Sequence, residues 1–145
     1  MKLGFFFRFL IDGFFRRRYS ASKNRLAKDA LGDAGEKLAI RFLKANRYQV
    51  IARNVRFSIG EIDVIARHKK TLVFIEVKTR QSTQYCHPIE VVDKKKRQKI
   101  KQMAMQYYRN EKYAVKGCAM RFDIITLIWP EGKQPQIEHF VDAFR

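Results

Sequence analysis

The feature that most constrains the fold of this chain is a pair of neighbouring strand-like runs at residues 61–67 and 71–79. Both runs are rich in β-branched and aromatic residues, which favour strands. The spacer between them is too short for a crossover, so the two strands are expected to pair antiparallel. Residues 48–57 form a similar run just before them. The sequence therefore predicts an antiparallel meander of three strands.

Helical patterns flank this meander. Apolar residues at three- and four-residue spacing predict a first helix between Asp33, as its N-cap, and Asn46, where it stops. A second helix is expected to open at Pro88 and to run to about Asn110, and two further strands follow within residues 120–141. The order is α-β-β-β-α-β-β, so the fold class is α/β with a mixed sheet.

Three charged residues interrupt the strands where a sheet prefers apolar side chains, namely Asp63, Glu76 and Lys78. Because strand residues alternate between faces, Glu76 and Lys78 share one face of their strand. A turn centred on residues 69–70 places Asp63 opposite Glu76, with roughly 5 Å between their Cβ atoms. The same register places Glu61 opposite Lys78.

Two carboxylates side by side on a half-buried face repel each other, and one of them then has a raised pKa. A divalent cation removes this conflict, because Mg²⁺, or Mn²⁺ in its place, prefers oxygen ligands such as carboxylates. Lys78 lies on the same face, where its ammonium can orient an attacking water or stabilise charge on a phosphoryl oxygen. This arrangement is typical of phosphodiester hydrolysis.

The same charges also have a structural interpretation. In an ion network without catalysis, Glu61 and Lys78 pair across the strands. Arginines such as Arg53 or Arg56 then neutralise the other two carboxylates. The isolated pattern of charges is weak support for either interpretation, so both stay open.

Glu36, in the first predicted helix, is a candidate third carboxylate. It shares a stripe with Ile40 and Leu43, so its side chain can face the sheet. The spacing Asp33-x-x-Glu36 is also that of a capping box, in which Glu36 bonds back to the helix start and does no chemistry. The spacing does not choose between these two roles.

The charge balance points to a polyanionic partner. There are 31 Lys and Arg against 14 Asp and Glu, a net charge of +17, which favours nucleic acid first and an acidic membrane surface second. We expect a group of basic residues near the site to contact DNA phosphates without reading sequence. These residues are Arg80, Lys94, Lys95, Arg97 and Lys101.

Residues 1–28 are expected to form a basic, aromatic N-terminal extension, separate from a domain at residues 29–145. The apolar run in the extension is interrupted by charges and is too short to span a bilayer. The extension can alternatively contact an anionic lipid surface. A membrane-surface protein is therefore a further functional alternative. The two cysteines, Cys86 and Cys118, have no disulfide or metal-site spacing, which indicates a reducing, cytoplasmic compartment.

A longer set of motifs surrounds the charged strands and covers about residues 31–144. The motifs are Gly32-x-x-Gly35-Glu36, Arg53-Asn54-x-Arg56, Gly60-Glu61-Ile62-Asp63, Glu76-Val77-Lys78-Thr79-Arg80, Pro88…Val92…Lys96 and Arg121-Phe122-Asp123. Together they resemble the YraN-like family of bacterial proteins, which is similar to archaeal Holliday-junction resolvases and to the PD-(D/E)XK nucleases. The resemblance implies a restriction-endonuclease-like fold, with a central mixed β-sheet flanked by helices.

The resemblance also implies roles for individual residues. Asp63 and Glu76 match the metal ligands of these nucleases, and Lys78 matches their catalytic lysine. Glu36 corresponds to the acidic residue on the first helix of the resolvases, which favours a catalytic and metal-binding role for it. Ile62 stands where the motif has its proline. Resolvases of this type act as dimers on branched DNA, so the resemblance further implies a homodimer and a branched substrate.

These observations predict a Mg²⁺-dependent, endonuclease-like protein that binds DNA and hydrolyses its phosphodiester bonds. The alternative is a non-catalytic nucleic-acid-binding module with the same fold. The two classes differ in whether a divalent metal binds at the opposed carboxylates.

Overall fold

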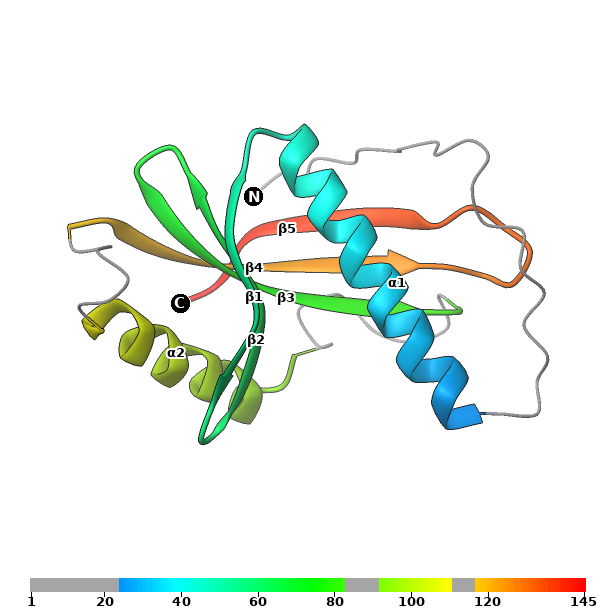
Figure 1. Cartoon of the computed structure of the whole chain (residues 1–145), viewed down its shortest axis with the longest axis horizontal. Helices are drawn as coiled ribbons and strands as arrows, with labels where there is room; N and C mark the ends of the chain where they lie inside the picture. The colour runs from blue at the N-terminus through cyan, green and yellow to red at the C-terminus, as the bar shows by residue number, and fades with distance from the viewer. Residues whose placement is uncertain (1–23, 83–91, 111–116) are drawn as a thin grey trace.

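The computed structural model describes residues 24–82, 92–110 and 117–145, which form two helices and one five-stranded sheet (Figure 1). In chain order the elements are α1 (Asn24–Ala45), β1 (Gln49–Phe57), β2 (Gly60–His68), β3 (Thr71–Arg80), α2 (Lys94–Arg109), β4 (Ala119–Ile128) and β5 (Gln136–Phe144). The predicted α/β class and element order are confirmed. The predictions made for residues 1–23, Cys86 and Pro88 lie outside the described ranges.

The sheet is mixed, as predicted. Its strand order is β1-β2-β3-β4-β5, and all neighbours pair antiparallel except β3 and β4, which are parallel. A parallel pair needs a long crossover, and the connection between β3 and β4 contains α2. An α/β sheet with this topology and a helix on each face is consistent with a restriction-endonuclease-like fold.

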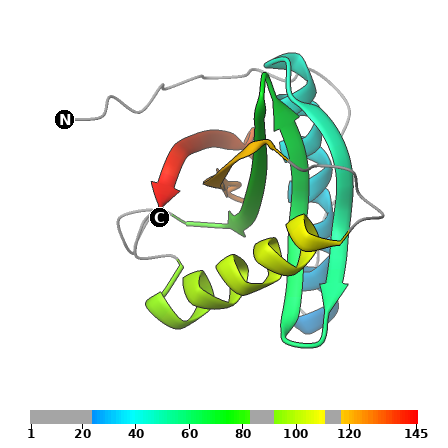
Figure 2. The same ribbon diagram turned by 90° about the vertical axis from the view of Figure 1, so that its left-hand side faces the viewer.

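Alternation along the strands divides the apolar side chains between two cores. Val73 and Ile75 of β3 pack in the cluster beneath α1, whereas Leu72 and Phe74 pack in the cluster beneath α2. Figure 2 shows the two helices on opposite sides of the sheet. Residues 72–77 of β3 are therefore buried on both faces, and the charge of Glu76 in this stretch is removed from bulk water.

Helix α1 begins earlier than the sequence predicts. Asp33 and Glu36 lie inside it, so Asp33 is not an N-cap and the capping-box interpretation of Glu36 is wrong. The predicted domain boundary at residue 28 also falls within this helix. Its end is as expected, because Asn46 follows the last helical residue and its side-chain amide donates to the carbonyl of Phe42 at 2.8 Å.

Helix α2 begins at Lys94, with Asp93 as its N-cap, which is later than the start at Pro88 that the sequence predicts. The Asp93 carboxylate accepts a hydrogen bond from the Lys96 backbone N–H at 2.7 Å, which satisfies one of the free donors of the first turn. The apolar face of α2 packs on the sheet through Ile100, Met103, Ala104 and Tyr107. Neither α1 nor α2 has an apolar stretch long enough to cross a bilayer.

Candidate active site

The predicted register of β2 and β3 is confirmed from the pair His68–Thr71 to the pair Val64–Ile75. The described ladder ends there, one residue before Asp63. The backbone N–H of Val77 instead donates to the Asp63 carboxylate at 2.7 Å. A side chain thus replaces the main-chain acceptor where the two strands part, and this fixes Asp63 against β3.

Glu76 lies on β3 with only 2% of its surface exposed. Its Oε1 atom contacts the ammonium of Lys78 at 2.5 Å and also the ammonium of Lys96, which comes from α2. Its Oε2 atom is buried and has no hydrogen-bond partner among the described residues. Two ammonium groups therefore contact Oε1 of Glu76, whereas Oε2 has no hydrogen-bond donor among the described residues.

Asp63 is 9% exposed and lies within the electrostatic range of Glu76. Burial, and then the negative charge of Glu76, raises the pKa of Asp63 to about 7. The Val77 N–H and the ammonium groups of Lys78 and Lys96 act in the opposite direction but do not cancel this effect. The raised pKa of one carboxyl is the behaviour expected of two opposed carboxylates.

Glu36 reaches the same end of the sheet from α1. Its side chain is half-buried, and burial raises its pKa, with Glu61 and Glu76 among the charges that add to the effect. When the amide of Asn54 is oriented to satisfy its neighbours, its nitrogen donates to Glu36 Oε2 at 3.0 Å and to the Asp63 carbonyl at 3.3 Å. Asn54 thus links the α1 carboxylate to the strand that carries Asp63.

Asn54 was not among the predicted site residues. Its φ of 50° places it in the left-handed region, which Asn tolerates better than most residues. The Arg53-Asn54-x-Arg56 motif was the only signal in the sequence that could have found it.

Gly35 allows α1 to approach the site closely. A Cβ atom at this position would lie 1.8 Å from Oγ1 and 2.9 Å from Cβ of Thr79, the residue after Lys78. Only glycine fits such a contact without displacing β3. The glycine beside Glu36 in the motif is thus explained by helix–strand packing, whereas Gly32 faces open space.

The structural ion network considered from the sequence is wrong in its pairings. Glu61 lies 3.7 Å from Arg56 on the surface, and Lys78 pairs with Glu76 instead of Glu61. Within the described ranges, neither Asp63 nor Glu76 forms an ion pair with an arginine. Lys96 was missed as a site residue because it lies twenty positions from Glu76 in the sequence and is brought there only by the packing of α2.

The five predicted DNA-contacting residues have different environments. Arg80, Lys94 and Lys95 are exposed. Arg97 donates from Nε to the Val92 carbonyl at 2.6 Å and lies 5.9 Å from the ring centre of Phe144. The ammonium of Lys101 contacts the carbonyl of Arg145. The side chains of the first three extend into solvent, whereas those of Arg97 and Lys101 also contact other residues of the protein.

A second charged cluster, which the sequence did not reveal, forms around Asp123. Arg121 donates to both oxygens of this fully buried carboxylate, at 2.8 and 2.9 Å, and His139 contacts it at 2.9 Å. Burial alone would raise the pKa of Asp123, but the hydrogen bonds from His139, Arg121 and the Asp142 N–H hold it below its usual value. This cluster is satisfied internally, unlike the pair Asp63 and Glu76.

The carboxylate pair fits a divalent cation. A buried acceptor without a partner among the described residues, such as Glu76 Oε2, is uncommon in native proteins and is explained by stored strain, a bound water, an ion or a catalytic role. In the part of the chain that the structure describes, no three His, Cys, Asp or Glu side chains lie close enough to share an ion. One or two carboxylates are the usual protein contribution to a Mg²⁺ site, so the pair is compatible with such an ion. Metal binding by Asp63, Glu76 and Glu36 stays a prediction.

The fold, with two opposed carboxylates and a lysine on its central strands, defines a restriction-endonuclease-like α/β protein. Residues 35–127 match the family described as "Uncharacterised protein family UPF0102", and the chain belongs to this family. Relatives called "UPF0102 protein" are 41% identical in Geotalea daltonii, over 79% of this chain and 88% of the relative, and 41% identical in Geobacter metallireducens, over 82% and 95%. A relative in Rhodococcus opacus is also 41% identical, over 79% of this chain and 96% of its own. The resemblance to the YraN-like family is confirmed.

Proposed function

We propose that this protein is a Mg²⁺- or Mn²⁺-dependent endonuclease that binds DNA and hydrolyses its phosphodiester bonds. One observation carries the proposal: within the described part of the chain, the buried Oε2 of Glu76 has no hydrogen-bond partner. The pKa of the neighbouring Asp63, raised to about 7, supports it. Two buried carboxylates on neighbouring strands, only partly compensated by their surroundings, cost stability. A metal-binding function gives a reason for this cost, whereas a purely structural role does not.

Asp63 and Glu76 would hold the metal ion, and the bound ion would polarise a phosphoryl oxygen and lower the pKa of a water. The carboxyl of Asp63 must lose its proton to act as a ligand. Because its pKa is near 7 in the absence of metal, metal affinity is expected to fall about tenfold for each pH unit below that value.

Lys78 would act at the scissile phosphate as an ammonium. Burial lowers the pKa of Lys78, but the charge of Glu76 and the hydrogen bond to it raise the pKa above its usual value. The side chain is 32% exposed, so substrate can reach it. A lysine that keeps its proton cannot be a general base, and its role is to orient water or to stabilise charge on a phosphoryl oxygen.

The exposed side chains of Arg80, Lys94 and Lys95 would contact phosphates that flank the cleaved bond. Such contacts give affinity that falls with salt and does not depend on sequence. A homodimer that acts on branched DNA is part of the same proposal, since it follows from the resemblance to the resolvases.

The experiment is incubation of the purified protein with linear, single-stranded, flapped and four-way DNA, in Mg²⁺ or Mn²⁺ and in EDTA. Cleavage should require the metal. It should be lost in Asp63→Ala and Lys78→Ala and kept in Lys70→Ala, a matched lysine variant in the β2–β3 turn. DNA binding, measured separately in EDTA, should remain in all three variants. Metal-dependent cleavage that survives both site changes would refute the assignment.

One observation favours the non-catalytic alternative, because Lys78 and Lys96 already neutralise one oxygen of Glu76. A binding module could keep the carboxylate for this pairing alone. Titration calorimetry with Mn²⁺ separates the two functions: a nuclease should bind the ion in the wild type and not in Asp63→Ala, and a binding module should show no uptake in either.

A further inference from the structure

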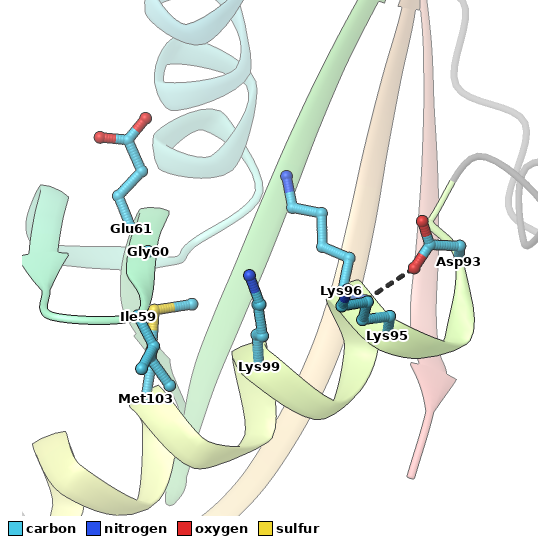
Figure 3. Close-up of a pocket in the computed structure, with 8 residues that line it drawn as sticks. All are labelled: Ile59, Gly60, Glu61, Asp93, Lys95, Lys96, Lys99 and Met103. Atoms are coloured by element: carbon cyan, nitrogen blue, oxygen red, sulfur yellow. Dashed lines mark hydrogen bonds between the residues drawn. The ribbon is translucent and has the colours of Figure 1, made fainter.

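A pocket of about 400 Å³ lies between the β1–β2 turn and the first turns of α2 (Figure 3). Its lining combines apolar and basic side chains with two acidic ones, Glu61 and Asp93. Ile59 from the turn and Met103 from α2 are apolar, and Lys95, Lys96 and Lys99 from α2 are basic. The volume falls in the range of pockets that hold small organic molecules.

The pocket adjoins the candidate active site through Lys96. This residue lines the pocket, and its ammonium contacts Oε1 of Glu76. Figure 3 shows the side chains of Lys96 and Lys99 extending from α2 in the same direction. A molecule in contact with Lys96 in the pocket would therefore be next to a side chain that also contacts Glu76.

The positive charge of the three lysines is only partly compensated by the two acidic residues of the lining and by Glu76, which pairs with Lys96. In the ranges that the structure describes, neither Lys95 nor Lys99 forms an ion pair. Of the acidic residues in the lining, Asp93 accepts from the Lys96 N–H as the helix cap, and Glu61 lies 3.7 Å from Arg56. The basic side of the pocket is thus available to an anionic group of a ligand.

Gly60 borders the apolar side of the pocket. Its φ of 153° is a conformation that other residues rarely adopt, and a Cβ atom there would be in van der Waals contact with Met103, 3.5 Å from its sulfur. A side chain at this position would enter the space in front of Met103. The absence of one leaves a surface against which a flat, weakly polar group can pack.

We infer that this pocket receives one unpaired nucleotide next to the scissile phosphate, with its base against Ile59 and Met103 and its phosphate near Lys95 and Lys99. The inference rests on the proposed function, since it is the proposed cleavage that places DNA at Glu76. It assigns the substrate class: DNA with an unpaired or extruded nucleotide at the cleavage point, in preference to regular duplex.

The preference follows from the cost of exposing a base. In a regular duplex the base is stacked and paired, and moving it into a pocket costs a few kcal/mol, whereas a bulged or single-stranded base has already lost these contacts. Packing of one base against a protein surface contributes about 1–3 kcal/mol. We therefore expect about tenfold or greater preference for a bulged site.

The test is fluorescence anisotropy in EDTA, which removes any dependence on catalysis. A DNA duplex with one unpaired nucleotide is compared with the same duplex fully paired. The wild type should bind the bulged duplex about tenfold more tightly. Lys99→Ala and Ile59→Ala should lose most of this preference while their affinity for the paired duplex changes less than about twofold. Lys70→Ala, at the opposite end of β2, should keep the preference, and circular dichroism should show all variants folded.

Equal affinity of the wild type for the two duplexes would overturn the inference. So would variants that weaken both duplexes equally, because this result would make Lys99 an ordinary phosphate contact. A bulge preference that depends on Lys99, in a protein that cleaves no DNA in Mg²⁺ or Mn²⁺, would uphold the pocket and refute the nuclease. Metal-dependent cleavage of paired and bulged duplex at the same rate would support the nuclease and refute the proposed role of the pocket.

Discussion

Replacing Asp63 by asparagine should stabilise the protein at neutral and alkaline pH when no divalent metal is present. Burial and the charge of Glu76 raise the pKa of Asp63 from its ordinary 3.8 to about 7. One pKa unit corresponds to about 1.4 kcal/mol, so the ionised carboxylate costs the folded state about 4 kcal/mol. Asparagine has nearly the same shape, keeps an oxygen for the Val77 N–H and carries no charge.

The sign of the pH dependence follows from the raised pKa. Below about pH 4 the Asp63 carboxyl is largely protonated in both the folded and unfolded states. The folded state then has no cost from a buried negative charge at this position. Between about pH 4 and 7 the unfolded state ionises first, so wild-type stability falls by about 1.4 kcal/mol per pH unit. Above about pH 7 the loss is complete and the curve is flat.

The measurement is urea denaturation in EDTA, followed by circular dichroism across this pH range. The advantage of Asp63→Asn over the wild type should grow with pH and level off near pH 7. Asp33→Asn, at an exposed position on α1, is the control and should show no such growth. A difference that does not change with pH, or an asparagine variant that is less stable at pH 8, would refute the assignment of the raised pKa to Asp63. Added Mg²⁺ should stabilise the wild type at pH 8 and leave Asp63→Asn unchanged.

Three further predictions concern the surroundings of the site. Gly35→Ala should lose about 1–3 kcal/mol of unfolding free energy through its clash with Thr79; the control Gly32→Ala, in open space on the same helix, should gain about 0.5–1 kcal/mol, and equal effects would contradict the close contact. Asn54→Gly tolerates the φ of 50° but removes the amide, so the pKa of Glu36 should rise further in a carboxyl NMR titration; an unchanged pKa would show that Asn54 does not donate to it. Arg121→Met should cost about 3–5 kcal/mol in urea denaturation, because Asp123 would stay buried with its main cation gone. Arg67→Met, exposed on β2, should cost little, and a similar loss in both variants would argue against the Asp123 cluster as a stabilising unit.

The strands could be predicted because their signals are local. A three-residue spacer between β-branched runs fixes both the direction and the register of β2 and β3, and with them the meeting of Asp63 and Glu76. The register could not show that the ladder ends at Val64, since this depends on the Asp63 side chain taking the place of a main-chain acceptor.

The remaining features depend on packing between distant segments. The Asp33-x-x-Glu36 spacing imitates a helix start, and only the residues before it show that α1 continues upstream. Lys96 reaches Glu76 because α2 packs across the sheet, which no spacing rule predicts. Likewise, Arg121, His139 and Tyr48 meet around Asp123 only after β4 has paired with both β3 and β5.

The hydrogen bond from Val77 to Asp63 makes one backbone amide a natural reporter of the site. Most amides of a central strand are protected by a neighbouring main chain, and their exchange with deuterium reports on the opening of the sheet. The Val77 amide is protected by a carboxyl group instead. We expect its exchange rate and chemical shift to follow the protonation of Asp63 while the amides beside it stay constant, so a single resonance can be used to observe the site without any attached label.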